Sequence, residues 1–330
     1  MQTNEESLAL AKEIIEAGGL VAFPTETVYG LGANALNEDA CRKIFVVKGR
    51  PNDNPLIVHV HRDYDISSLV TAIPEYAWRL RKAYLPGPLT MVFKSLGTVC
   101  PAVSCGLDTV AIRVPSNPKA QEFLRYVDLP VAAPSANISK HVSPTSAEHV
   151  LADFNGLIPL ILDGGECTGG IESTVLDCTG PVPVVLRSGL VTREMVAAVA
   201  GDCRVHIPVA GEKVRSPGMK YSHYSPRCRT ALYTEENISA AVARYDAECA
   251  KGAAVSFICL DETAQKLGSR RCLNIGRTAE EGARNLYRML REGEKELDMI
   301  IGIAPAGRDG VMAGLMNRFE KACGGVYEES

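Results

Sequence analysis

Residues 20–32 read LVAFPTETVYGLG, a short apolar run followed directly by a stretch rich in Pro, Thr and Gly. The apolar run (20–23) predicts a buried strand that ends at Pro24. Ligands in an open α/β sheet sit beyond the carboxyl ends of its strands, so PTETVYGLG (24–32) is a candidate ligand loop. A tight turn capped by threonines explains the same composition, and this stretch alone does not separate the two readings.

The residues up to 207 alternate between helical and extended patterns. A first helix is predicted between a capping box, Thr3 with Glu6, and a stop at Gly18-Gly19. Further helices are expected over 37–47 and 74–84. Strands are expected over 56–60, 89–93, 110–114, 130–133, 157–162, 174–177 and 183–186. Many strands with few helices predict an α/β fold with a twisted open mixed sheet and flanking helices.

The chain restarts after an aperiodic stretch that contains three prolines. We expect a catalytic domain over 1–207, a linker or lid over 208–228 and a smaller C-terminal domain over 229–330. The last segment alternates strands and helices and predicts a Rossmann-like α/β domain. Its first strand is not followed by G-x-G-x-x-G, so dinucleotide binding is unsupported.

Composition excludes several classes of protein. The chain has 330 residues, 46% of them hydrophobic and 22% charged, which is enough apolar material for ordinary cores and excludes a disordered tail protein. Its 11 Cys never occur as C-x-x-C, which predicts reduced thiols and no protein-held metal site. No apolar run is long enough for a membrane helix, and the acidic N-terminus is unlike a signal peptide. We therefore expect a cytoplasmic protein.

The net charge of −4 argues against strong direct binding to nucleic acid, because proteins that grip long nucleic acids usually carry a basic surplus. A local basic pocket remains compatible with that total. Most cations that could form one follow predicted strands or end helices.

The segment KGRPNDNPL (48–56) holds Lys48, Arg50 and Asn54 in a loop stiffened by two prolines. A planar Arg fork suits phosphate, although cations at a helix end also favour the helix dipole. Arg113 lies inside the apolar strand VAIRV and is costly to bury without a partner. That partner is either a structural acid or an anionic ligand.

Two later loops carry small polar side chains and glycines. Ser135 and Ser143 lie in APSANISKHVSPTS (133–146), where they can bind phosphate oxygens or simply cap turns. DGGECTGGIESTV (163–175) allows close backbone approach but lacks the Lys-Ser/Thr of a P-loop. With Arg187 at the end of a later strand, these loops predict a local positive pocket for a small anion such as a nucleotide.

Five motifs then occur in one order: PTETVYGLG (24–32), KGRPNDNPL (48–56), PSAN (134–137), GGIESTV (169–175) and SPGMKYSHYSP (216–226). Together they resemble the threonylcarbamoyl-AMP synthase family, in the long form that joins a YrdC-type domain to a C-terminal domain. The resemblance covers essentially the whole chain. It implies an ATP-using nucleotidyltransferase that makes L-threonylcarbamoyl-adenylate and pyrophosphate from L-threonine, bicarbonate and ATP.

The resemblance also implies roles for particular residues. L-Threonine would be bound by Thr27, His59, Arg113, Ser173 and the backbone at Ala133. ATP would be bound by Arg50, Asn54, Thr109, Ser135, Ser143, Arg187 and Tyr224, with Tyr224 as a lid residue. Lys48 and Arg50 are the expected catalytic residues, because negative charge builds on phosphate oxygens during the reaction.

The same resemblance implies that Mg²⁺ enters with ATP and has few or no protein ligands. A separate tRNA threonylcarbamoyl transferase complex would consume the product to modify the adenosine beside the anticodon. Two alternatives remain at this point. One is a non-enzymatic RNA-binding role, against which the acidic balance argues. The other is the related carbamoyl-adenylate chemistry of hydrogenase maturation proteins, whose acylphosphatase-like and zinc-finger segments are missing here.

Overall fold

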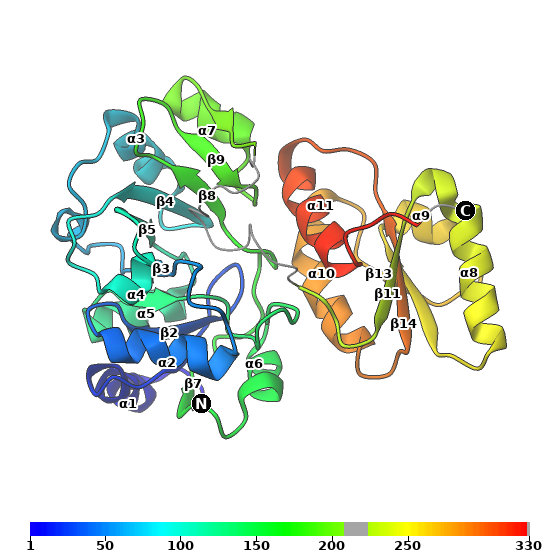
Figure 1. Cartoon of the computed structure of the whole chain (residues 1–330), viewed down its shortest axis with the longest axis horizontal. Helices are drawn as coiled ribbons and strands as arrows, with labels where there is room; N and C mark the ends of the chain where they lie inside the picture. The colour runs from blue at the N-terminus through cyan, green and yellow to red at the C-terminus, as the bar shows by residue number, and fades with distance from the viewer. Residues whose placement is uncertain (208–223, 329–330) are drawn as a thin grey trace.

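The computed structural model describes residues 1–207 and 224–328, which form two α/β domains (Figure 1). The N-terminal domain is built on a ten-stranded sheet. Its strands run from edge to edge as β10 (Arg204–Val205), β9 (Val184–Arg187), β8 (Thr174–Asp177), β4 (Leu89–Lys94), β5 (Thr109–Arg113), β3 (Ile57–His59), β6 (Val131–Ala133), β2 (Gly30–Asn34), β1 (Val21–Phe23) and β7 (Leu160–Ile161). The sheet is mixed, since β3 is parallel to β5 and antiparallel to β6.

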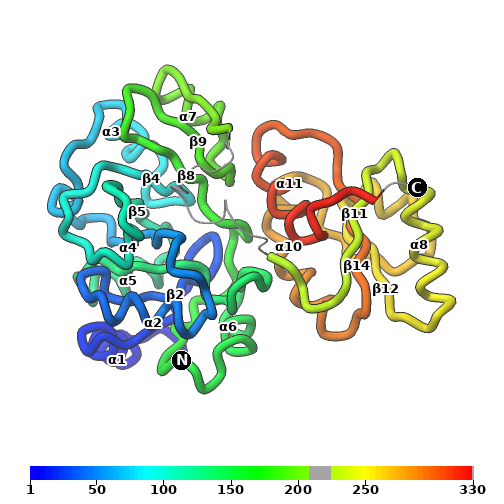
Figure 2. The backbone as a smooth tube through the Cα atoms, in the orientation of Figure 1, coloured from blue at the N-terminus to red at the C-terminus, as the bar shows by residue number. Residues whose placement is uncertain are grey.

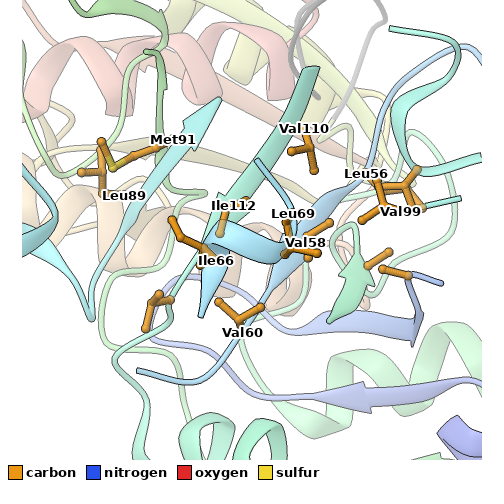
Figure 3. Close-up of a cluster of buried hydrophobic side chains, with 14 of the residues drawn as sticks. Leu56, Val58, Val60, Ile66, Leu69, Leu89, Met91, Val99, Val110 and Ile112 are labelled. Atoms are coloured by element: carbon orange, nitrogen blue, oxygen red, sulfur yellow. The ribbon is translucent and has the colours of Figure 1, made fainter. Parts of the chain in front are cut away.

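One face of this sheet is covered along its whole width. The side chains of Val58, Met91 and Ile112 point to this face and form a large hydrophobic cluster that includes Ile66 and Leu69 (Figure 3). The helical elements that contribute to the cluster or pack beside it are α2 (Glu38–Lys48), η1 (Ile66–Ser68), α3 (Glu75–Tyr84), α4 (Pro101–Ser104), α6 (Ala147–Phe154) and α7 (Arg193–Ala200).

The opposite face is covered only in part. Helices α1 (Glu5–Glu16) and α5 (Pro118–Val127) pack there on β1, β6 and β7. Because side chains alternate along a strand, Ile57, Ala111 and Val175 point to this face as well. They form a small separate cluster. On this face of the sheet, α1 and α5 therefore do not cover the central strands β3, β5, β4 and β8.

The mixed α/β class is confirmed, but several local expectations were wrong. Strand β2 occupies the end of a stretch expected to be loop, and helices α4 to α7 were not expected. Helix α5 begins with an Asn117 cap and Pro118 at its first turn, which is a recognisable start signal. Helix α1 is capped by Asn4 with Ser7, one residue later than the expected capping box, because Asn4 accepts from the Ser7 amide.

The C-terminal domain holds a four-stranded parallel sheet. Its order is β11 (Arg229–Thr234), β14 (Met299–Ala304), β12 (Val255–Cys259) and β13 (Cys272–Asn274). Helices α10 (Ala279–Gly293) and α11 (Gly310–Ala322) lie on the side that faces the N-terminal domain. Helix α8 (Ile238–Ala250), preceded by η2 (Glu235–Asn237), and helix α9 (Asp261–Gln265) lie farther from it, as the backbone trace shows (Figure 2).

The two domains share a hydrophobic cluster. Val28, Val142 and Ile171 of the N-terminal domain belong to the same buried cluster as Leu286 of α10 and Leu315 of α11. Burial of apolar surface stabilises a structure by about 25 cal/mol per Å². This shared cluster therefore favours a fixed docking of the two domains.

Two glycines bring the domain backbones into direct contact. A Cβ atom on Gly170 would lie 2.4 Å from the Ala283 carbonyl oxygen of α10. A Cβ atom on Gly314 of α11 would lie 3.0 Å from the Gly189 Cα atom. Any larger residue at either position would push the domains apart. Most of the expected linker, residues 208–223, lies outside the described residues.

Candidate active site

A pocket of about 720 Å³, part of it open to solvent, lies on the sheet face that α1 and α5 leave uncovered. Side chains of the central strands line its floor, namely Ile57 and His59 of β3, Arg113 of β5 and Ala133 of β6. The remaining lining residues are Tyr224 and residues from five other segments: Thr25, Val28, Tyr29, Gly30, Lys48, Arg50, Pro134, Ser135, Asn137, Ser139, Lys140, His141, Glu172 and Arg187.

Five lysine and arginine side chains line this pocket. Lys48, Arg50, Arg113, Lys140 and Arg187 come from segments that are far apart in the sequence. Burial lowers the pKa of Arg50 to about 10, so its guanidinium remains charged at neutral pH. The Nε atoms of Arg50 and Arg113 are buried and have no hydrogen-bond partner in the part of the chain that the structure describes. An anion in the pocket is the natural partner for these donors.

The Lys48 side chain is hydrogen-bonded to backbone groups of its own domain, which the sequence did not indicate. Its Nζ atom donates to the carbonyl oxygens of Ser135, at 2.6 Å, and of Asn137. The Ser139 amide donates in turn to the Lys48 carbonyl oxygen at 2.8 Å. Burial strongly lowers the pKa of Lys48, and the positive charge of Arg50 lowers it further. Lys48 therefore ties the loop after β6 to the end of α2.

Arg113 has a structural acid as its partner. Its Nη2 atom donates to Glu26 Oε1 at 2.8 Å and to Thr27 Oγ1 at 2.7 Å. Glu26 also accepts from the Ser116 amide at 3.0 Å. Both charged side chains are buried, which explains how a strand arginine is tolerated here. Glu26 and Thr27 accept from the Nη2 atom of the guanidinium, whereas its Nε atom has no partner among the described residues.

His59 lines the pocket as a neutral imidazole. Burial, helped by the nearby charge of Arg113, lowers the pKa of His59 to about 3. Its Nδ1 atom lies 3.0 Å from the Ile57 carbonyl oxygen, and its ring meets Phe23 edge to face at 5.6 Å. The ring is thus fixed and can offer hydrogen bonds without adding charge.

Arg187 and Ser173 form one hydrogen-bonded unit. Arg187 Nε donates to the Ser173 carbonyl oxygen at 3.1 Å, and its Nη2 donates to Ser173 Oγ at 3.2 Å. Ser173 Oγ also lies 2.8 Å from Thr90 Oγ1 of β4. The position of the arginine therefore depends on the backbone of the GGIESTV loop.

Tyr224 lies against the C-terminal domain and lines the pocket at the same time. Its ring stacks on Tyr287 of α10, with centroids 5.4 Å apart and planes 30° apart. Its φ of 73° lies in the left-handed region, which is unfavourable for a bulky side chain and costs on the order of 1–3 kcal/mol. Strain of this kind is concentrated at functional sites.

Five expected site residues are not among the lining residues of the pocket: Thr27, Asn54, Thr109, Ser143 and Ser173. Thr27 and Ser173 hold Arg113 and Arg187, and Ser143 Oγ donates to Glu172 Oε1 at 2.7 Å. Both amide atoms of Asn54 are buried without a partner among the described residues. Such an unsatisfied amide is suited to a polar ligand.

Sequence reasoning missed three titratable residues of the lining, namely Lys140, His141 and Glu172. Burial opposes ionisation of Glu172, but Arg318 and Arg187 outweigh it and lower its pKa to about 2. A lone glutamate inside IEST is a signal that could have been noticed, because such a residue before a buried strand needs a partner.

His141 joins the two domains at the pocket. Its Nδ1 atom lies 3.0 Å from Asp153 Oδ1 of α6, and its Nε2 atom lies 2.8 Å from Glu294 Oε1, just after α10. Burial opposes the charge, but these two hydrogen bonds outweigh it and raise the pKa of His141. Arg291 of α10 also donates to Asp153, at 2.8 Å, so a buried charge network spans the interface.

None of the described helices is long and apolar enough to cross a lipid bilayer. Within the described ranges, no group of His, Cys, Asp and Glu is arranged to hold a metal ion.

Two family models together match nearly the whole chain. Residues 13–189 match a family model of the Sua5, YciO and YrdC type, described as telomere recombination. Residues 191–324 match the threonylcarbamoyl-AMP synthase C-terminal domain. The chain is 42% identical to threonylcarbamoyl-AMP synthase of Bacillus subtilis and 41% identical to that of Pyrococcus abyssi. These alignments cover 98% and 97% of this chain, and 95% of each relative.

Solved structures agree with the sequence comparison. Pyrococcus abyssi Sua5 complexed with L-threonine superposes with a TM-score of 0.88 at 40% identity, covering 97% of this chain and 95% of that one. Escherichia coli YciO matches 57% of this chain and 91% of its own, with a TM-score of 0.51 at 26% identity. The motifs, the two-domain architecture and these similarities agree, and the chain belongs to the threonylcarbamoyl-AMP synthase family.

Proposed function

We propose that the pocket joins L-threonine, bicarbonate and ATP into L-threonylcarbamoyl-adenylate and pyrophosphate. The observation that carries the proposal is the convergence of five lysine and arginine side chains, two of which hold buried guanidinium nitrogens without a described partner. A site of this kind favours a ligand with several negative charges, such as a nucleoside triphosphate. Family membership supports the particular reaction.

In the proposed reaction the threonine amine adds to bicarbonate with loss of water and gives a carbamate. A carbamate oxygen then forms a bond to the α-phosphorus of ATP, and the bond from that phosphorus to the bridging oxygen breaks. Pyrophosphate leaves with the electron pair of that bond. The protein contributes chiefly by positioning the reactants and by stabilising charge on the phosphate oxygens.

The floor of the pocket is proposed to hold L-threonine. Arg113 still has an Nε donor that Glu26 does not use, and this donor suits the substrate carboxylate. His59, neutral and fixed, and the backbone of Ala133 line the same floor. Thr27 and Ser173 would act indirectly: Thr27 holds Arg113 in place, and Ser173 holds Arg187 in place.

The mouth of the pocket is proposed to hold ATP between Arg50, Arg187 and Ser135, with Tyr224 closing over the nucleotide. Asn54, Thr109 and Ser143 complete the proposed ATP set. Lys48 has two of its three protons committed to backbone carbonyls, which leaves one for a phosphate oxygen. A phosphate there would also raise the lowered pKa of Lys48, so nucleotide binding and protonation of this lysine should be coupled.

Mg²⁺ is proposed to enter on the ATP phosphates and to supply charge neutralisation there. Among the described lining residues the carboxylate is Glu172, and its oxygens accept from Ser143 and Arg318. The chain thus offers the ion few oxygen ligands of its own, which fits an ion carried by the substrate.

We further propose that the product is passed in the cytoplasm to a separate tRNA threonylcarbamoyl transferase complex. The adenylate is a reactive mixed anhydride, so its consumer must be a group-transfer reaction that releases AMP. The proposed role of this chain ends with the adenylate, and strong direct binding of nucleic acid is not part of it.

The test is pyrophosphate release from ATP and Mg²⁺, with L-threonine and bicarbonate each present or omitted. Release that requires both, and that falls when L-serine replaces L-threonine, is the expected result. Release that is independent of L-threonine would refute the proposed substrate, and the absence of release under all conditions would refute the reaction.

A further inference from the structure

A buried ion pair between the domains, Arg318–Glu172, reaches the lining of the pocket. Arg318 of α11 is fully buried, and its Nε atom donates to Glu172 Oε2 at 2.9 Å. Glu172 lies in the GGIESTV loop of the N-terminal domain and lines the pocket. A C-terminal side chain therefore reaches a residue of the active-site lining directly.

The same guanidinium holds two loops at once. Arg318 Nη1 donates to the Ser188 carbonyl oxygen at 2.7 Å, and its Nη2 donates to the Glu172 carbonyl oxygen at 3.4 Å. Ser188 directly follows Arg187, and Glu172 directly precedes Ser173. The two residues next to these anchor points, Arg187 and Ser173, are those that bond to each other beside the pocket.

Glu172 extends the contact to two further residues. Its carboxylate accepts from Ser143 Oγ at 2.7 Å and from Tyr287 Oη at 3.1 Å. Tyr287 in turn stacks on Tyr224. One buried carboxylate thus links the backbone loop of Ser143, the tyrosine pair and Arg318.

We propose that Arg318 is a positioning residue for ATP: through Glu172 and the Ser188 carbonyl it sets the placement of Arg187, Ser143 and Tyr224. The inference rests on the proposed function, because it assumes that these residues face the nucleotide. It gives the C-terminal domain a direct part in nucleotide binding, beyond that of a neighbouring support.

The geometry requires an arginine. Three nitrogens of one planar, rigid group contact a carboxylate and two carbonyl oxygens on two different loops. A lysine keeps the charge but presents a single nitrogen, which cannot reproduce the contacts that three nitrogens of a planar fork make with the two loops. Arg318→Lys is therefore the informative variant, since it preserves charge and removes the geometric constraint.

The experiment measures ATP binding by calorimetry on the full chain in the presence of Mg²⁺, without L-threonine or bicarbonate. Arg318→Lys should raise the Kd for ATP on the order of 10-fold, which is what the loss of one charged hydrogen bond typically causes. The Kd for L-threonine, measured separately, should rise less than that for ATP, because among its expected contacts only Ser173 lies on a loop that Arg318 bonds.

Arg291→Lys is the matched control. Arg291 is also a buried arginine of the C-terminal domain, but its N-terminal partners are Asp153 and the Val142 carbonyl oxygen, on the other side of Ser143 from Glu172. If both variants weaken ATP binding equally, the effect is one of domain docking and the inference is wrong. Thermal unfolding of both variants ensures that folded proteins are compared.

Glu172→Gln supplies a second route that leaves Arg318 in place. It should weaken ATP binding, and the Arg318→Lys, Glu172→Gln double variant should be no weaker than the worse single variant. Additive effects would overturn the inference. A wild-type chain that bound no ATP would instead refute the proposed function itself, so the two failures are distinguishable.

Discussion

Replacing Glu172 by Gln should remove a pH-dependent part of the stability of this protein. The folded state holds the pKa of Glu172 at about 2, against an ordinary value of 4.5, because the charges of Arg318 and Arg187 outweigh its burial. At about 1.4 kcal/mol for each pKa unit, this difference favours the folded state by about 3 kcal/mol at neutral pH. Breaking a buried ion pair typically costs about 3–5 kcal/mol, which agrees.

The direction with pH follows from the lowered pKa. A carboxyl group of this kind contributes its full stability above the unfolded value of 4.5 and loses it as the pH falls towards 2. At pH 3 about 1 kcal/mol of the contribution remains, so the wild type should lose about 2 kcal/mol from this group between pH 7 and pH 3. The Gln variant has no carboxyl group at this position and should not lose this part.

The assay is urea unfolding of the wild type and the Glu172→Gln variant at pH 7 and pH 3. The other carboxyl groups titrate in both proteins, so their effects cancel in the difference between the two. The free-energy gap between wild type and variant should narrow by about 2 kcal/mol at pH 3. An unchanged gap would show that Glu172 is not the ionised partner of Arg318, and the reasoning above would be refuted.

Three further outcomes are expected. Arg50→Ala should lower the rate of pyrophosphate release by about 10²–10³-fold, as loss of one donor to a developing oxyanion does, and an unchanged rate would contradict this role. Arg113→Lys should raise the KM for L-threonine on the order of 10-fold and leave that for ATP unchanged, which steady-state kinetics with each substrate varied would check. His141, with its pKa raised by Asp153 and Glu294, should stabilise the protein below about pH 6.5 and lose this effect as the pH rises through the raised value. His141→Gln should therefore flatten the alkaline decline of the unfolding midpoint, and a decline as steep as in the wild type would exclude the histidine as its cause.

Local patterns predicted most strands and the loops that carry the pocket, because strands and turns depend on near neighbours in sequence. The cost of burying Arg113 predicted that it needs a partner, and this partner is Glu26. That residue lies 87 positions away, so no local pattern could identify it. For the same reason the sequence did not reveal that the Lys48 nitrogen donates to carbonyls of a loop that only folding brings near.

Helix α5 illustrates a different kind of miss. Its cap and its Pro118 are visible in the sequence, but its ten residues are short beside the strongly apolar strands on either side. The Glu172–Arg318 pair was out of reach altogether, since its members lie in different domains and 146 positions apart. Domain docking therefore determined the part of the site that sequence reasoning did not predict.

The glycine contacts between the domains restrict how the two halves can be recombined. At Gly170 and Gly314 main chain meets main chain, so the fit is set by the paths of two backbones rather than by exchangeable side chains. A hybrid that joins the first half of this chain to the second half of a relative would keep its activity only if those paths match. A change at one of these surfaces would have to be accompanied by a compensating change at the other, so the two domains should evolve together.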